Sequence, residues 1–352
     1  MTTISPPDTV PEERTASHRM PFWVNQRLGL LVLVIALSVL FGVLRPAFLD
    51  QQLVLFPLLR DVATLTVVAL AQMVALSVGH MNLAVGRMAA FGAMFAGLGY
   101  DRLGVPMQVG LLMCLAAGAA IGAVTGWLIA RTGVSSFVVT LAMDFALLGL
   151  VSLLYSALTD DAAFTTHPTG IDQLRSYSLA DICAGPVCGS PAVPQIAQFT
   201  VLAMLALGFL YGCTRIGREL LLTGANPAAA ELSGIPTGRR VLLAHTLSGL
   251  LAALAGFMAA GTGTFRASIG DDFMLPSFLG AVLGGTLLTG GVVSVLGTLL
   301  GTALVGVIRK GLDLLGVGLE SLNIYLGCVL LLALSADRIR TVVSYRKVVR
   351  ST

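Results

Sequence analysis

The sequence predicts an all-α polytopic membrane protein with about ten transmembrane helices, some broken by glycine, and both termini cytoplasmic. Of its 352 residues, 56% are hydrophobic and only 11% are charged, whereas a soluble domain carries about 25% charged residues. A surface with so little charge must face an apolar medium, and a bilayer is the ordinary one. The 40 glycines suit membrane helices, which pack closely through small residues. The basic residues cluster in a few segments, as topology signals do, so we expect no nucleic-acid partner.

Ten apolar runs are close to the about 17–25 residues that a membrane-spanning helix needs. They are 28–44, 62–78, 86–100, 107–130, 134–157, 198–214, 240–262, 276–290, 293–308 and 321–336. Glycines interrupt the pair 276–290 and 293–308 most strongly. The first run lacks a small-residue cleavage site, so we interpret it as an uncleaved helix.

The positions of arginine and lysine predict the orientation. We expect 1–27 to be a disordered cytoplasmic tail, 28–336 the transmembrane domain and 337–352 a basic cytoplasmic tail. Within the domain, the basic segment 215–240 is expected on the cytoplasmic side and the long loop 158–197 in the periplasm. Arg309 and Lys310 contradict this pattern, because the same alternation places them outside.

The loop 158–197 contains Cys183 and Cys188 around a Gly-Pro turn. In an oxidising compartment the two thiols could form a short-loop disulfide, or both could remain free. No His/Glu spacing predicts a metal site, and no Ser/His pair or paired intramembrane aspartates predict an enzyme.

The segment 215–240 predicts a short helix with defined ends. Asn226 can cap the free amides of the first turn, and Pro227 suits the first helical position. Gly234 can adopt the left-handed conformation that ends a helix, and Pro236 prevents its restart. Two turns of helix are too short to be stable alone, so we expect this helix to dock on another molecule or, alternatively, to be a surface helix without a partner.

Polar residues inside spans are costly and often functional. Asp144 is either a pathway residue or a helix-packing group, and His80 beside Asn82 is either a pathway group or a helix-end cap. His245 lies near the start of the run 240–262 and is expected at the membrane interface. A glycine pattern also recurs at constant spacing, which indicates either an internal repeat with two broken helices, as in many transporters, or chance matching in a glycine-rich chain. The pattern pairs Gly79, Leu83, Gly86 and Gly92 with Gly284, Leu288, Gly291 and Gly297.

Several motifs resemble the sugar-type (ribose/xylose/arabinose) permeases of ABC importers, which are related to the branched-chain amino-acid permeases. The loop motif appears as Gly217-Arg218, Gly224-Ala225-Asn226, Ala229-Ala230 and Ser233-Gly234-Ile235. It is followed by Ser248–Gly256, Gly284–Gly291, Gly297–Gly301 and Gly311–Val317. The resemblance extends over nearly the whole chain after residue 28.

The resemblance implies a permease dimer, homomeric or heteromeric, in the bacterial inner membrane and in contact with its lipid. A cytoplasmic ABC ATPase would dock on the 215–240 loop and bind ATP and Mg, and a periplasmic substrate-binding protein would deliver a sugar or sugar-like solute. This chain would hold no cofactor. The coupling candidates are Gly217, Arg218, Asn226, Pro227, Ala230, Glu231 and Gly234. The translocation-pathway candidates are Gly79, His80, Asn82, Gly86, Asp144, Gly284, Gly285 and Gly291.

The first glycine break departs from the family pattern Gly-Gly-x-Asp-Leu-Ser-Val-Gly. Here His80, Asn82 and Ala84 replace the second glycine, the aspartate and the serine. Asparagine keeps donors and an acceptor but loses the charge. Import of another polar solute, such as a nucleoside, a polyol or an autoinducer-like sugar, is therefore the alternative function, ahead of a channel or an intramembrane enzyme.

Overall fold

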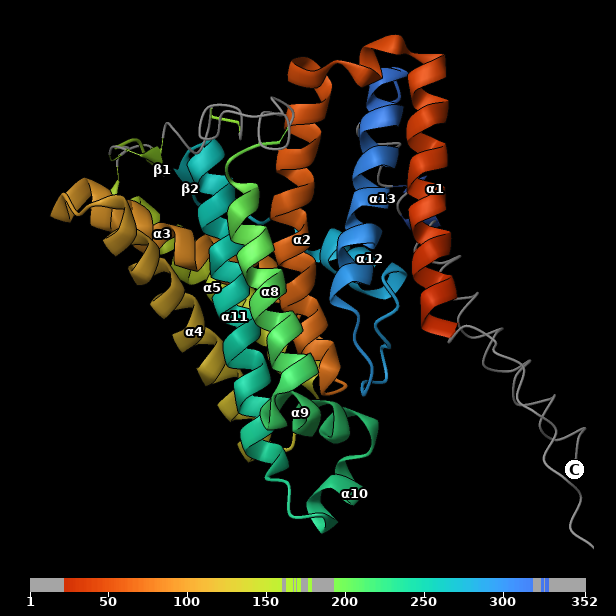
Figure 1. Cartoon of the computed structure of the whole chain (residues 1–352). Helices are drawn as coiled ribbons and strands as arrows, with labels where there is room; N and C mark the ends of the chain where they lie inside the picture. The colour runs from red at the N-terminus through yellow and green to blue at the C-terminus, as the bar shows by residue number, and fades with distance from the viewer. Residues whose placement is uncertain are drawn as a thin grey trace, which may run out of the picture.

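The computed structural model describes residues 22–159 and 193–318, together with 163–166, 168, 170–171, 177–178, 324–325 and 327–328. This part of the chain is almost entirely helical (Figure 1). The α-helices are α1 (Phe22–Leu44), α2 (Phe56–Ser77), α3 (Val85–Leu103), α4 (Met107–Thr132), α5 (Ser136–Leu158), α8 (Ala197–Cys213), α9 (Arg215–Ala225), α10 (Pro227–Leu232), α11 (Thr237–Thr262), α12 (Met274–Leu283) and α13 (Val295–Leu314). A 3-10 helix (Pro46–Leu49) and a π-helix (Gln51–Leu55) join α1 to α2.

Among these residues, six helices are long and apolar enough to cross a membrane: α1, α2 with its preceding π-helix, α4, α5, α11 and α13. A seventh span is added if α8 and α9, which meet at a bend of 77°, are counted together. The prediction of an all-α polytopic membrane protein is therefore confirmed. The last predicted run, 321–336, lies largely outside the described residues, as do Cys183 and Cys188.

Two predicted boundaries are wrong for local reasons. The run 276–290 does not form one helix, because α12 ends at Leu283 and Gly285 adopts a φ of +92°. The run 293–308 continues instead to Leu314, so that Arg309 and Lys310 belong to α13. A chain segment without regular helix thus joins α12 to α13.

The core is built around α2, whose side chains from Val67 to Met73 are all inaccessible to solvent. Helix α11 packs against α2, α3 and α4. Its approach to α4 depends on Gly118, Gly122 and Gly126. A Cβ atom at Gly122 would lie 2.3 Å from the backbone oxygen of His245, so only glycine permits this close crossing.

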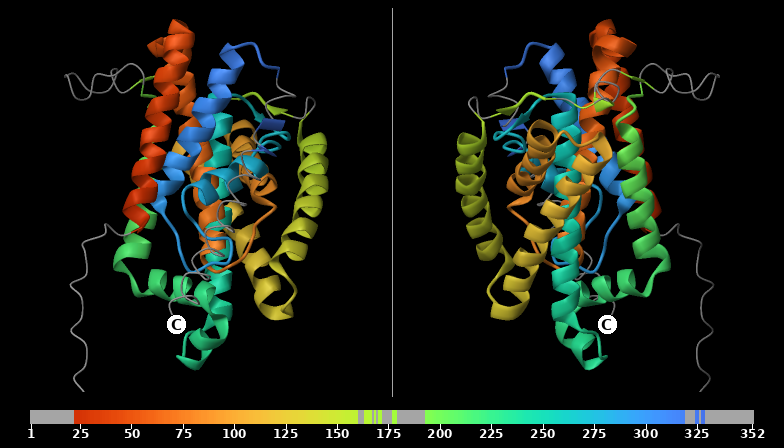
Figure 2. Two further views of the ribbon diagram at one scale, coloured as in Figure 1. Left: turned by 90° about the vertical axis from the view of Figure 1, so that its right-hand side faces the viewer. Right: turned by 90° about the vertical axis from the view of Figure 1, so that its left-hand side faces the viewer.

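Apolar side chains remain exposed on the peripheral helices α1, α5 and α8, including Val43 at 76%, Leu153 at 63% and Leu202 at 66% exposed. Such faces are expected where helices contact lipid. Helices α9 and α10 lie at one end of the molecule, and the short antiparallel strands β1 (Ala163–Phe164) and β2 (Phe265–Arg266) lie toward the other (Figures 1 and 2). The two ends therefore differ in structure.

Candidate functional site

Helix α10 has the caps that the sequence predicts. The side-chain oxygen of Asn226 accepts a hydrogen bond from the backbone N–H of Ala229 at 3.1 Å, and Pro227 occupies the first helical position. Gly234 follows the helix with a φ of +78°. Of the candidate coupling residues in this helix, Ala230 is buried, whereas Glu231 is exposed and accepts a hydrogen bond from Thr237.

One side of α10 packs on nothing in the described part of the chain. Leu232 is 92% exposed, and Asn226, Pro227, Ala228 and Ala229 are exposed as well. The exposed leucine and the small residues give this side of α10 an apolar surface, and a helix this short depends on contacts with other elements for its stability.

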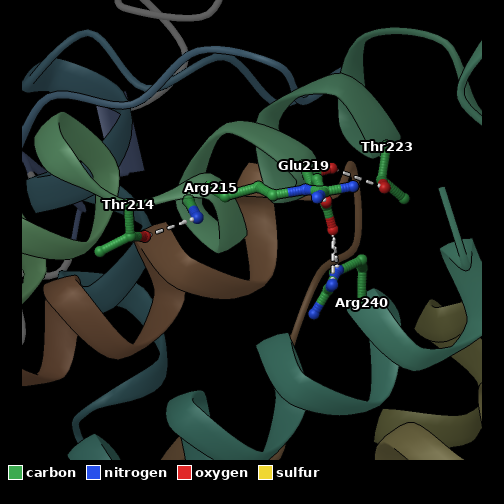
Figure 3. A network of polar contacts seen from close by, with 6 residues as sticks. Thr214, Arg215, Glu219, Thr223 and Arg240 are labelled. Carbon is green, nitrogen blue, oxygen red and sulfur yellow. Dashed lines mark hydrogen bonds and ion pairs between the residues drawn. The ribbon is translucent and has the colours of Figure 1, made fainter.

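Helix α9 is held to the start of α11 by a network around Glu219 (Figure 3). The buried carboxylate of Glu219 accepts hydrogen bonds from Nε of Arg215 at 2.7 Å and from Nε of Arg240 at 2.6 Å. Together these bonds, that of Arg215 first, hold the pKa of Glu219 below its ordinary value of 4.5. The Thr214 hydroxyl accepts from the backbone N–H of Gly217 and so caps α9. Arg218, by contrast, is exposed.

Three backbone segments meet where α9 ends. The backbone N–H of Gly291 donates to the backbone oxygen of Ser77 at 3.1 Å. A Cβ atom on Gly224 would lie 2.1 Å from that same oxygen and 2.7 Å from the nitrogen of Gly291. A Cβ atom on Gly290 would lie 2.6 Å from the nitrogen of Gly79 and 2.9 Å from the oxygen of Gly224. We call Ser77, Gly79, Gly224, Gly290 and Gly291 the glycine junction.

The glycine junction brings together parts of both predicted broken helices. Gly79 belongs to the break between α2 and α3, and Gly290 and Gly291 belong to the break between α12 and α13. Gly284 and Gly285 lie elsewhere in the second break, where Gly284 packs against Gly297. Gly86 lies apart from the junction too and packs against Gly270. The pathway candidates are therefore distributed over several places and do not form one cluster.

Asn82 is fully buried at the start of α3. Its side-chain oxygen accepts from the backbone N–H of Ala84 at 3.1 Å, and its amide donates to the hydroxyl of Ser248 at 3.0 Å. Asn82 therefore fixes the backbone of the broken segment and links it to α11 through a hydrogen bond. Because the asparagine amide is neutral, this arrangement avoids the cost of burying a charge.

His80 and His245 lie together in the same region, with Nδ1 of His80 at 3.3 Å from Nε2 of His245. His245, which the sequence predicts near the membrane interface, has a side chain that is fully buried in α11. Close packing of α11 on α4 and α3 buries the ring, which hydropathy alone does not reveal.

Asp144 has a partner that the sequence did not identify. Nε of Arg87, in the first turn of α3, lies 3.9 Å from the carboxylate of Asp144 in α5. The same arginine binds Asp271 through Nη1 at 2.5 Å.

Among the other residues that the sequence did not identify, Glu219 and Arg215 carried a signal of an ion pair, since they are four positions apart on one helix. Arg240 carried none, because only the fold brings it to Glu219.

Comparisons with known proteins agree with this architecture. Residues 54–334 match the family described as "Branched-chain amino acid transport system / permease component". The ribose import permease protein RbsC of Escherichia coli (strain K12) is 30% identical over 332 residues, which cover 92% of this chain and 98% of that protein. The autoinducer 2 import system permease protein LsrD of Photorhabdus temperata is 29% identical, over 88% of this chain and 91% of that protein. No solved structure is significantly similar.

These matches imply a transporter rather than an enzyme and agree with the apolar helices. They do not favour the alternatives of a channel or of a permease for a nucleoside or a polyol. The chain belongs to the branched-chain amino acid transport system / permease component family, as a sugar-type permease subunit of a multi-pass membrane transporter.

Proposed function

We propose that this chain imports a monosaccharide across the bacterial inner membrane as one subunit of a permease dimer, powered by a separate cytoplasmic ATPase. The names of the relatives, which refer to ribose and autoinducer 2 import, support a sugar-like solute. In this proposal the chain crosses the membrane about ten times with both termini in the cytoplasm. ATP and Mg are bound by the ATPase, and a periplasmic binding protein supplies the solute at the end of the molecule that carries β1 and β2.

The observation that carries the proposal is the position of α10. This helix presents an exposed leucine and a row of small residues at the end of the molecule opposite β1 and β2 (Figure 1). We assign the docking of the ATPase to this surface, formed by Asn226, Pro227, Ala228, Ala229 and Leu232. A second permease chain, identical or different, completes the transporter.

The glycine junction can transmit a displacement of the docking surface to the broken helices in the membrane. Only Ala225 and Asn226 separate Gly224 from α10, and Gly224 is in backbone contact with both broken segments. The network around Glu219 keeps α9 rigid, so a displacement of α10 reaches Gly79 and Gly290 instead of being absorbed in a loop. Movement of both breaks together would open one side of the pathway and close the other, as alternating access requires.

The test is reconstitution of the chain with the ATPase and the binding protein encoded beside its gene, in proteoliposomes. We expect ATP-dependent uptake of labelled D-ribose, D-xylose or L-arabinose. Uptake that proceeds without any ATPase, or no sugar uptake at all, would contradict the proposed function.

A separate variant tests whether the ATPase docks on α10. Leu232→Asp should reduce co-purification of the ATPase at least tenfold, because a charge replaces the apolar contact. Leu49→Asp is the matched control, since Leu49 is 58% exposed and belongs to the 3-10 helix outside the candidate spans. Equal recovery of the ATPase with Leu232→Asp and with the native chain would refute docking on α10.

A further inference from the structure

A cavity of about 370 Å³ opens at the end of the molecule opposite α10. It lies where α2 begins and where α11 and α13 end, next to the segment that follows β2. Its volume is within the range of about 300–1,000 Å³ that small-molecule sites occupy. It therefore suits a small solute and not a peptide chain.

The cavity collects charges of both signs. Asp61 on α2, Asp272 after β2, and Arg309, Lys310 and Asp313 on α13 all line it. Side chains of this kind are costly against lipid, so the cavity must face water or a protein partner. The cavity also explains why Arg309 and Lys310 occur at a position where the predicted topology expects few basic residues.

Three of these charged side chains form no ion pair or hydrogen bond with another lining side chain. Lys310 and Asp313 form an ion pair at 3.3 Å, three residues apart on α13. No hydrogen bond or ion pair joins Asp61, Asp272 or Arg309 to another side chain within the described part of the chain. A structural ion-pair network would pair these groups, whereas a binding site leaves them available.

The chemistry of the lining fits a neutral polyhydroxylated ring. Carboxylates accept hydrogen bonds from hydroxyl groups, and arginine and lysine donate to hydroxyl and ring oxygens. Phe273 also lines the cavity and adds an aromatic side chain, which can cover the apolar face of a sugar ring. Three carboxylates against two cations leave little net charge, so neither an anion nor a strong cation is favoured.

We propose that this cavity is a monosaccharide site on the outer half of the pathway, in which Asp61, Asp272 and Arg309 bind the sugar hydroxyls and Phe273 covers the ring. This inference rests on the proposed function, because a sugar importer needs a place to receive the solute after its release from the binding protein. The cavity is separate from the broken segments at Gly79 and Gly290, so it would hold the solute before the pathway opens inward.

The experiment uses the permease–ATPase complex in lipid nanodiscs without the binding protein. Thermal unfolding is followed while D-ribose is raised through the millimolar range, with L-alanine as the comparison solute. We expect D-ribose to raise the unfolding temperature saturably and L-alanine to have no effect, since a ligand that binds only the folded state stabilises it.

Three variants locate the effect. Asp61→Asn, Asp272→Asn and Phe273→Leu should each require about tenfold more D-ribose for the same shift. Asp50→Asn is the matched control, because Asp50 caps the π-helix from an exposed position outside the cavity and asparagine caps equally well. Phe273→Leu keeps an apolar group, so it remains informative if a charge variant does not fold.

The outcomes separate the two proposals. A native complex that D-ribose does not stabilise, or variants that respond like the native complex, would overturn the sugar site. Either result can coexist with ATP-dependent sugar uptake in proteoliposomes, in which case the proposed function stands. Absence of any sugar uptake by the native complex would instead overturn the proposed function.

Discussion

Gly291 donates its backbone N–H to the backbone oxygen of Ser77, and this bond joins the two broken segments of the chain directly. Gly224, which is separated from α10 by Ala225 and Asn226, packs against both partners of that bond. The Tyr211 hydroxyl donates to the Ser77 hydroxyl at 3.0 Å and adds a contact from α8. A surface helix and two interrupted membrane helices thus share one junction, which is the basis of the first prediction.

Gly224→Ala should abolish transport and destabilise the protein by about 1–3 kcal/mol, the usual cost of overpacking. The new Cβ atom would meet two backbone atoms that cannot rotate away. Uptake and thermal unfolding measure the two effects. Gly238→Ala is the control, since its Cβ atom would meet only the Ala130 side chain at 3.8 Å. Native behaviour of Gly224→Ala would show that the junction tolerates movement of this size.

Asn82→Ala should destabilise the protein by about 1–3 kcal/mol, because it removes a buried helix-end bond and leaves the Ser248 hydroxyl without its donor. Ser248→Ala alone should cost less, because the bond of Asn82 to Ala84 remains. The coupling between the two sites, measured by chemical or thermal unfolding of both single variants and the double variant, should be about 0.5–3 kcal/mol. Strictly additive effects would argue against a direct bond.

Glu219→Gln should lower thermal stability at neutral pH, because a neutral amide replaces a carboxylate held by two arginines. The pKa of Glu219 is lowered in the folded state, so the unfolded state binds the proton more tightly. The stabilisation by Glu219 is therefore complete above the ordinary pKa of 4.5 and is lost as the pH falls through the lowered folded value.

The difference in unfolding temperature between native protein and Glu219→Gln should accordingly shrink when the pH falls below about 4.5. Glu231→Gln serves as the matched control, since Glu231 is exposed and no arginine binds it among the described residues. A difference that stays constant down to acid pH would mean that the Glu219 charge is not what stabilises α9.

Asp271→Asn should reduce stability more than Asp144→Asn does. Asp271 lies 2.5 Å from Nη1 of Arg87, whereas Asp144 lies 3.9 Å from Nε. Asp271 is 47% exposed, so solvent screens the pair and a cost of about 1 kcal/mol is expected. Charge reversal in Arg87→Asp combined with Asp271→Arg should recover part of the loss in thermal unfolding. Equal effects of the two asparagine variants would contradict this order.

Local sequence signals predicted a large part of the architecture. Apolar runs identified α1, α4, α5, α8 and α11 to within about six residues, because a membrane helix satisfies its backbone within one segment. The caps of α10 were also predicted, because Asn226 and Gly234 act on backbone groups next to them in the chain. The run 276–290 extended beyond the end of α12 at Leu283, because hydropathy continues across the glycines that break the helix.

The sequence by itself determined that the chain is a many-helix membrane protein with two glycine breaks and a short capped helix, because each property depends on neighbouring residues. The tertiary structure alone decided that Gly224 meets Gly79 and Gly290, that His245 is buried beside His80, and that Arg309 faces Asp61 across a cavity. Each of these relationships joins residues far apart in the chain, and close packing of helices through glycine fixes them. Residue spacing carries no information about such contacts.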